Sequence, residues 1–275
     1  MLKNNKLLVD EDCPLCVAYG AGFTRLGLID PRTVSPYQRA DAKMTRQIDM
    51  QRARSEIALY DETTTRTVYG IDAMIAIVAH RAPWLRRLLT WAPLYFLLQQ
   101  LYSFISYNRK VIYPSASRPG LRDCTPPLHR GYRWGYILLV ALLTGLVLNR
   151  YAFLISTGWG LPHDPIREYF ICFGQVAWQG IAIGFLDRKK VLTYLGNMST
   201  VSLMGAILLL PLLGLASWVP VAPWLLLGYF AVVVGIMLLE HLRRCRLLGI
   251  SHTMTFSWVA YRTVVLGSIL LLSFL

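Results

Sequence analysis

The chain has 275 residues, of which 55% are hydrophobic and only 16% are charged. Its net charge of +13 could suit a nucleic-acid partner, but the basic residues are scattered singly or stand at the ends of apolar runs, which favours an anionic membrane surface instead. Five cysteines, an odd number with one close pair, are not the disulfide framework of a secreted protein. From Tyr132 onward there are ten Lys or Arg and four Asp or Glu, so the composition predicts two domains.

The stretch 10–16, which reads Asp-Glu-Asp-Cys-Pro-Leu-Cys, stands between a strand-like run at 6–9 and a helix-compatible segment at 17–26. Cysteines three apart in the first turn of a helix lie within disulfide-forming range, and the helix N-terminus favours the thiolate of the first one. The pattern predicts reversible thiol-disulfide exchange. In this mechanism Cys13, the more acidic and more exposed thiol, attacks a substrate disulfide, and Cys16 resolves the mixed disulfide.

At these residues the sequence resembles the DCC family of thiol-disulfide oxidoreductases, which is named for an Asp-x-Asp-Cys-x-x-Cys signature. The signature residues here are Asp10, Asp12, Cys13 and Cys16. Two later stretches, 69–73 and 102–109, resemble further landmarks of that family, and the likeness covers roughly residues 6 to 113. The resemblance implies a thioredoxin-like α/β fold and redox chemistry.

Two positions depart from the pattern that the resemblance implies. Glu11 stands where members of the family commonly carry a glycine. The wider thioredoxin superfamily usually places a cis-proline opposite the CxxC, but no proline occurs here between Pro36 and Pro83. The resemblance therefore does not imply the ordinary thioredoxin manner of substrate docking.

The remaining elements of the first half complete a βαβαββα order, which places the CxxC at the C-terminal end of the first strand. They are an edge strand at 33–38 that contains Pro36, a surface helix at 40–54, a hairpin of 56–60 and 66–69, and a helix at 73–80 capped by Asp72. Residues 84–107 are interpreted as an amphipathic helical pair that covers this domain and can contact a membrane surface. Four prolines mark 114–131 as a linker between a domain at 1–113 and one at 132–275.

The second half is predicted to be an all-α domain of five transmembrane helices, because it contains five apolar runs of nearly spanning length. The runs are 134–157, 169–186, 198–218, 224–240 and 256–275. Basic residues precede the first run and follow the second and fourth. The positive-inside rule then predicts a bacterial-type inner-membrane protein with a cytoplasmic N-terminal domain and an external C-terminus.

Arg262 lies about eight residues inside the fifth run, where a lipid-facing guanidinium is costly. It is therefore predicted to face the bundle, with Gln175, Gln179 and Glu240 as candidate partners in a ligand site. The alternative is that Arg262 extends to the inner interface beside Glu240. His163, His241 and His252 are placed in or near loops, and nothing in the sequence indicates haem or quinone ligation.

The cysteine pair has two further interpretations: half of a zinc site, for which no second ligand pair exists at motif spacing, and an inert family remnant. Asp10 and Asp12 either relay protons or form an acidic turn that caps the helix. The sequence thus predicts a membrane-tethered thiol-disulfide oxidoreductase or redox sensor without metal or cofactor. Its expected partners are membrane lipids and a protein or small-thiol redox partner. The alternative is a membrane scaffold or small-molecule transporter with a regulatory DCC domain.

Overall fold

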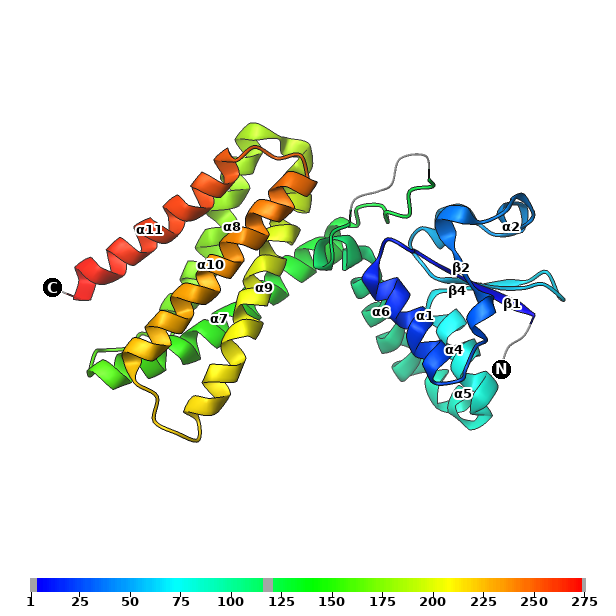
Figure 1. The fold of residues 1–275 in the computed structure, drawn as a ribbon, viewed down its shortest axis with the longest axis horizontal. Coiled ribbons are helices and arrows are strands. Elements are labelled where there is room, and N and C mark those ends of the chain that lie inside the picture. The colour runs from blue at the N-terminus through cyan, green and yellow to red at the C-terminus, as the bar shows by residue number, and fades with distance from the viewer. Residues whose placement is uncertain (1–3, 116–120, 274–275) are drawn as a thin grey trace. The chain divides into compact units, whose positions relative to one another are not determined.

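A computed structural model describes residues 4–115 and 121–273 and divides the chain into two compact units, Met1–Tyr132 and Arg133–Leu275. The first unit is built on a four-stranded sheet with the order β2-β1-β3-β4 (Figure 1). Its strands are β1 (Asn5–Val9), β2 (Val34–Pro36), β3 (Ala58–Asp61) and β4 (Thr67–Tyr69). β1 pairs with β2 in parallel, and the other two pairings are antiparallel. The predicted thioredoxin-like α/β fold is confirmed, including the edge position of Pro36.

Side chains of β1 alternate between the two faces of this sheet, so apolar side chains reach both faces. Helices cover each face and bury these side chains. Leu7 and Val9 pack with the two motif cysteines on one face, and Leu8 packs in a separate cluster on the other face. The helices are α1 (Pro14–Arg25), α2 (Ala42–Gln47), α3 (Met50–Ala53), α4 (Gly70–Arg81), α5 (Pro83–Leu89) and α6 (Ala92–Ile112). The last two are the predicted helical pair.

The single surface helix predicted over 40–54 is wrong, because α2 and α3 are separate. Ile48 breaks the run: it is buried, with extended backbone angles of φ −108° and ψ 131°. The Asp49 side chain then caps α3 by accepting from the backbone N–H groups of Gln51 and Arg52. Burial of Ile48 in the core therefore requires extended backbone angles at this residue, and these angles end helix α2.

The predicted capping of a helix by Asp72 is also wrong. Helix α4 begins two residues earlier, at Gly70, whose φ of +60° suits glycine. A Cβ at this position would lie only 2.7 Å from Glu56 Oε2. Asp72 sits inside the first turn, where it accepts a hydrogen bond of 2.9 Å from the Tyr95 hydroxyl. Sequence reasoning missed that the landmark glycine starts the helix.

The described part of the predicted linker folds against the first unit. Arg54 donates to the carbonyl oxygen of Thr125 at 2.8 Å, and Arg122 donates to that of Ala40 at 2.6 Å. These contacts tie residues 121–125 to the loops that flank α2 and α3. The last residues of the predicted linker already belong to helix α7 (Arg130–Trp159).

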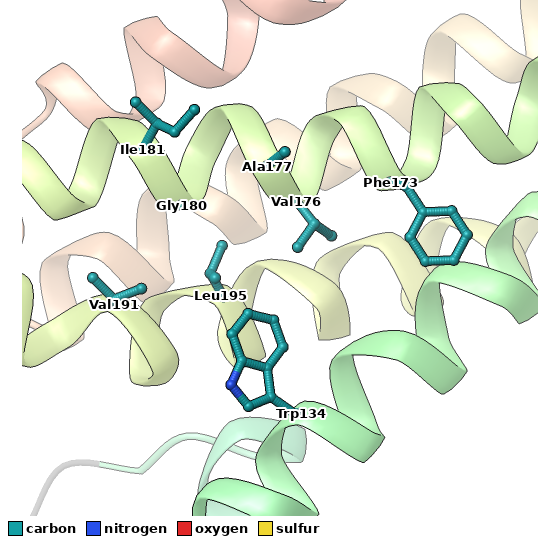
Figure 2. A pocket seen from close by; sticks show the side chains of 8 residues that line it. All are labelled: Trp134, Phe173, Val176, Ala177, Gly180, Ile181, Val191 and Leu195. Carbon is teal, nitrogen blue, oxygen red and sulfur yellow. The ribbon is translucent and has the colours of Figure 1, made fainter.

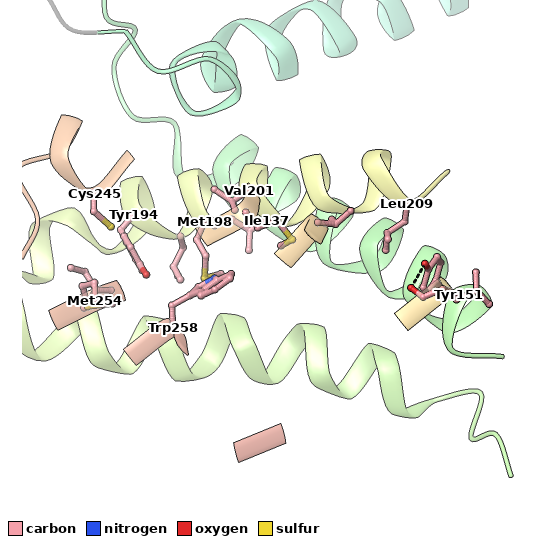
Figure 3. Packing of buried hydrophobic residues seen from close by; sticks show 14 residues of the cluster. Ile137, Tyr151, Tyr194, Met198, Val201, Leu209, Cys245, Met254 and Trp258 are labelled. Atoms are coloured by element: carbon pink, nitrogen blue, oxygen red, sulfur yellow. Dashed lines mark hydrogen bonds between the residues drawn. The ribbon is translucent and has the colours of Figure 1, made fainter. Parts of the chain in front are cut away.

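The second unit consists of helices, and five of them in the described residues are long and apolar enough to cross a membrane. They are α7, α8 (Arg167–Leu186), α9 (Val191–Ala216, preceded by a short turn), α10 (Pro223–Leu247) and α11 (Thr253–Ser273). Their apolar interior joins all five helices, with residues such as Ile137, Ile183, Met198, Val233 and Trp258 (Figure 3). The predicted all-α domain of five membrane-spanning helices is confirmed.

An apolar groove of about 460 Å³ lies between α7, α8 and α9 (Figure 2). No titratable side chain lines it; the lining residues include Trp134, Phe173 and Leu195. In a helix that crosses a membrane, such a surface suits contact with acyl chains rather than chemistry. The buried polar side chains of α8 and α10, such as Gln175, Gln179 and His241, do not line this groove.

Candidate active site

The motif turn is held by Asp10, the first residue after β1. Its carboxylate accepts from the backbone N–H of Asp12 at 3.0 Å and from the Gln38 side-chain amide at 2.5 Å. The Cys13 N–H donates to the Asp10 carbonyl oxygen at 3.2 Å and closes the turn. Gln38 also accepts from the backbone N–H of Glu11 at 3.1 Å. One buried carboxylate and one amide thus fix the backbone that presents Cys13.

Cys13 is the N-cap residue of α1, and Cys16 lies on its first turn. The Cys13 side chain makes no capping hydrogen bond with the backbone of α1. The N–H groups at the start of α1 are directed toward the Cys13 sulfur side of the turn, where a negative charge is favoured. Both cysteines carry free thiols.

The two thiols have strongly different acidities. A hydrogen bond from the Cys16 side chain lowers the pKa of Cys13 to about 6, against the opposing effect of burial, and the Cys16 backbone N–H and the charge of Arg109 act in the same direction. The same thiol-thiol hydrogen bond, together with burial, raises the pKa of Cys16 far above its usual range. Cys13 is therefore the thiolate of the pair at neutral pH, as the sequence predicted.

The predicted exposure of Cys13 is wrong. Cys13 is 0% exposed and Cys16 is 4% exposed, so both thiols lie in the core between β1, α1 and α4. The residues on either side of Cys13 are less buried: Asp12 is partly buried and Pro14 is exposed.

Arg109, near the end of α6, is a residue whose function sequence reasoning missed. Its Nη2 donates to the carbonyl oxygens of Arg54 at 2.7 Å and Cys124 at 2.6 Å, and lies 3.7 Å from Asp10 Oδ2. The Lys110 ammonium lies 3.3 Å from the same carboxylate oxygen. The buried Asp10 carboxylate is thus compensated by two cations from one helix. The only sequence signal was the landmark at 102–109, which carried no stated role.

Helix α6 is positioned for this task by contacts at helical spacing. The Tyr102 hydroxyl accepts from the Ile57 backbone N–H at 2.9 Å, and Ser106 donates to the carbonyl oxygen of Ser55. Arg109 follows on the same face, since residues three and four apart are neighbours on a helix. The contacts therefore hold α6 against the entry to β3 and direct Arg109 toward the motif.

Cys124 lies next to this cluster, although no spacing in the sequence relates it to the motif. Its Sγ lies 3.4 Å from Arg109 Nη2, and burial raises its pKa to about 12. It is 4% exposed and packs in the cluster on the opposite face of the sheet from the CxxC. Among the described residues, no group of three or more His, Cys, Asp or Glu side chains is arranged to hold a metal ion.

A chain of polar contacts crosses the interior of the second unit. The Tyr194 hydroxyl donates to Gln179 Oε1 at 2.8 Å and contacts His241 Nε2 at 3.0 Å. His241 Nδ1 lies 3.3 Å from Thr255 Oγ1, and the imidazole stacks on Trp258 with ring centres 5.5 Å apart. The placement of His241 in or near a loop is therefore wrong: it lies within α10 and is 1% exposed. His163 and His252 do lie in loops.

Arg262 and its predicted partners are arranged differently from the prediction. The guanidinium carbon of Arg262 lies 3.9 Å from the Trp258 ring centre. Glu240 pairs with Arg243 and Arg244 at 2.6 and 2.7 Å, and Gln179 contacts Tyr194 and Ser257. No hydrogen bond or ion pair within the described part of the chain joins Arg262 to Gln175, Gln179 or Glu240.

A thioredoxin-like α/β unit with a CxxC at the first turn of its first helix is the architecture of a thiol-disulfide oxidoreductase domain. Residues 7–114 match the family model of the DCC1-like thiol-disulfide oxidoreductases, and this part of the chain is a domain of that family. The match ends before the second unit. No curated protein and no solved structure matches the chain.

Proposed function

We propose that the protein is a membrane-tethered thiol-disulfide oxidoreductase in which Cys13 is the attacking thiolate and Cys16 the resolving thiol. The observation that carries the proposal is the pair of opposed acidities at the start of α1. The pKa of Cys13 is lowered to about 6 by the hydrogen bond from Cys16, so Cys13 is ionised at neutral pH. A thiolate is the nucleophile in disulfide exchange.

The exchange balances as a two-electron reduction of a partner disulfide. The Cys13 thiolate attacks one sulfur, which forms a mixed disulfide and releases the first partner thiolate. Cys16 then loses its proton and attacks the Cys13 sulfur, which forms the Cys13–Cys16 disulfide and releases the second partner thiolate. A dithiol donor restores the reduced pair, and the reverse sequence oxidises a partner dithiol.

Asp10 is the proposed acceptor of the proton that Cys16 loses. Its carboxylate acts electrostatically on both thiols, and its Oδ2 atom faces the cations of Lys110 and Arg109. The Gln38 amide, which donates to Asp10, also lies 3.5 Å from Asp12 Oδ2. Asp12 is only partly buried, so the two carboxylates connect Cys16 to solvent.

Alkylation of the detergent-solubilised full chain at varied pH tests the assignment of Cys13, with the modified cysteine identified by peptide mass spectrometry. We expect Cys13 to react first, with a rate that rises through a midpoint near pH 6, about three pH units below an ordinary thiol at 9.0. Cys16→Ala removes the hydrogen-bond donor and should move the midpoint upward. Cys16→Ser keeps a hydroxyl donor and should leave the midpoint closer to that of the parent.

Both variants lack Cys16, but only the serine variant keeps a hydrogen-bond donor to Cys13. The comparison therefore tests whether that hydrogen bond lowers the pKa of Cys13. If Cys16 reacted before Cys13, or if the alanine and serine variants gave the same midpoint, the assignment of roles would be wrong. Disulfide reductase activity should be lost in both Cys13→Ser and Cys16→Ser. The Cys16→Ser variant should nevertheless keep an alkylation midpoint of Cys13 close to that of the parent.

The same proposal places the first unit in the cytoplasm of a bacterial cell, at the inner membrane. Arg188, Lys189 and Lys190 follow α8, and Arg243, Arg244 and Arg246 lie in or after the last turns of α10. An excess of Lys and Arg marks cytoplasmic connections. A reporter fused after Lys190 or Arg246 should therefore lie in the cytoplasm, and a reporter fused after Leu275 should lie on the outer side of the membrane. A cytoplasmic C-terminal reporter would contradict this orientation.

A further inference from the structure

Helices α8 and α11 carry three side-chain nitrogen atoms that are buried and have no hydrogen-bond acceptor within the described residues. They are Gln175 Nε2 on α8 and Trp258 Nε1 and Arg262 Nε on α11. Gln175 and Trp258 are only 6% and 1% exposed. Buried polar groups are nearly always hydrogen-bonded, because a buried donor without an acceptor is costly. Three such donors on two neighbouring helices therefore require an explanation.

The contacts between α8 and α11 place these donors at one level of the bundle. The Tyr261 hydroxyl donates to the carbonyl oxygen of Ile171 at 2.8 Å, and the Trp178 indole donates to Ser257 Oγ at 2.9 Å. These two contacts fix an antiparallel register in which Gln175 lies midway between the two contact points. The segment of α11 opposite Gln175 is therefore the one that begins at Ser257 and ends beyond Tyr261.

Trp258 and Arg262 belong to that segment and lie four residues apart, so they share one face of α11. The Arg262 guanidinium stacks on the Trp258 ring at 3.9 Å. Trp258 points from α11 toward Met198 in the bundle interior (Figure 3). The register set by the two contacts puts Gln175 level with the residues beside Trp258, and Arg262 follows about one helical turn further along α11. The three donors thus lie within about one turn of the same level of the bundle.

The charge of Arg262 has no carboxylate partner in the described part of the chain. Glu168 pairs with Arg167 at 2.6 Å, and Glu240 pairs with Arg243 and with Arg244. Arg262 lies in the middle of α11, nine residues after Thr253, or about 14 Å along the helix axis at 1.5 Å per residue. A guanidinium at that depth is expected to pair with an opposite charge or to line a pathway for a substrate.

We propose that Gln175, Trp258 and Arg262 form a binding site inside the second unit for a carboxylate or a similar oxyanion. All three unpartnered atoms are donors, so the complementary group is an acceptor, and an anionic oxygen also neutralises the guanidinium. The ligand is either a small free carboxylate or the head group of an amphiphile that enters from the lipid. This site is independent of the redox chemistry proposed for the first unit, so either proposal can fail without the other.

Thermal unfolding of the full chain in a neutral detergent tests the site, with acetate, oleate and oleyl alcohol as probes. We expect a carboxylate to raise the melting temperature of the second unit, because a ligand that binds the folded state stabilises it. The alcohol should give no such shift. A shift with both acetate and oleate identifies a site for a free anion, and a shift with oleate alone identifies the head group of an amphiphile.

Three variants separate binding at this site from a general effect of the probes. Arg262→Gln should abolish the shift, whereas Arg243→Gln, an equal change of charge on α10, should retain it. Trp258→Phe keeps an aromatic ring beside the guanidinium but removes the N–H donor, so it should reduce the shift. This variant tests the site even if Arg262→Gln does not fold. The proposal is overturned if neither carboxylate shifts the parent, if oleyl alcohol acts as oleate does, or if Trp258→Phe and Arg243→Gln respond like the parent.

Discussion

Arg109 in the first unit and Arg262 in the second are both arginines that turn toward the interior, but their surroundings differ. Arg109 Nη2 contacts two backbone carbonyl oxygens and lies beside the Asp10 carboxylate, whereas Arg262 stacks on Trp258 and has no carboxylate partner among the described residues. The Nε atom of each lacks an acceptor. The first unit therefore compensates its buried charge from within the chain, while the second presents its charge to a partner from outside.

This difference shows what each arginine is for. A buried ion pair with further hydrogen bonds holds a fixed geometry, and in the first unit it fixes the turn that carries Cys13. A guanidinium whose charge has no carboxylate partner within the described residues remains able to bind an anion. The first arginine is thus a structural and electrostatic support for the thiols, and the second is a recognition group. The predictions below test this distinction.

The largest effect is expected for Arg109→Gln. The substitution leaves the Asp10 carboxylate with Lys110 alone and leaves two buried carbonyl oxygens, those of Arg54 and Cys124, without their donor. Breaking a buried pair in this way costs about 3–5 kcal/mol. The temperature at which the buried Cys124 becomes open to alkylation reports unfolding of the first unit, and we expect it to fall sharply.

Two other variants serve as controls for that experiment. Arg66→Gln removes an equal charge from an exposed position in the same unit and should leave the protection of Cys124 unchanged. Arg262→Gln should also leave it unchanged, and should affect the second unit less than Arg109→Gln affects the first, because no ion pair is broken. An equal loss of protection in Arg66→Gln would contradict the supporting role of Arg109.

A smaller effect is expected for Tyr194→Phe in the second unit. The hydroxyl bridges Gln179 Oε1 and His241 Nε2 inside the bundle, so its removal takes a hydrogen-bond partner from each of these two buried atoms. The expected loss is about 1–3 kcal/mol. Exposure of the buried Cys245 to alkylation on heating measures it. Tyr169→Phe, a change of the same hydroxyl at a position with no hydrogen bond of that group in the described structure, should be nearly neutral.

If Tyr194→Phe were as silent as Tyr169→Phe, the polar chain would contribute nothing to the stability of the bundle. The difference between Arg109 and Arg262 would then not be specific to these arginines, because other buried hydrogen bonds of the second unit would also contribute nothing to its stability. A clear loss would show that the hydrogen bonds of the Tyr194 hydroxyl contribute to the stability of the second unit.

Much of the fold could be predicted because it follows local patterns. Short strand-like runs indicated the strands of the first unit, and apolar length indicated the membrane helices. The break at Ile48 was missed because burial in the tertiary structure decided it, not helix propensity. Gly70 was missed because its need for a small residue arises from a distant contact with Glu56.

The candidate site divides in the same way. The proposed roles of Cys13 and Cys16 were inferred from their spacing at a helix start, where the structure places both, and the pKa of Cys13 is lowered as expected. Arg109 and Cys124 could not be placed from the sequence, because they reach the motif through packing over about a hundred residues of chain. In the second unit, His241 was placed near a loop because the apolar run ended before it, yet α10 continues to Leu247.

The smallest effect is expected at Glu11, the position where a glycine was expected from the resemblance. Its side chain pairs with Arg39 at 3.3 Å, but that arginine side chain is 61% exposed, and exposed pairs of this kind contribute only about 0.2–1 kcal/mol. The backbone N–H of Glu11 donates to Gln38 Oε1 whatever the side chain is. Glu11→Gln should therefore change the protection of Cys124 by little.

The neighbouring Asp10→Asn makes this last prediction discriminating, because it changes an adjacent carboxylate by the same isosteric step. Asp10 is 1% exposed at its side chain and compensates two cations, so its replacement leaves Arg109 and Lys110 without their anion. The turn and the alkylation midpoint of Cys13 should respond to Asp10→Asn and not to Glu11→Gln. If Asp10→Asn and Glu11→Gln changed the alkylation midpoint of Cys13 equally, the two carboxylates would act on the site to the same extent. Arg109 would then not be compensated by Asp10 alone.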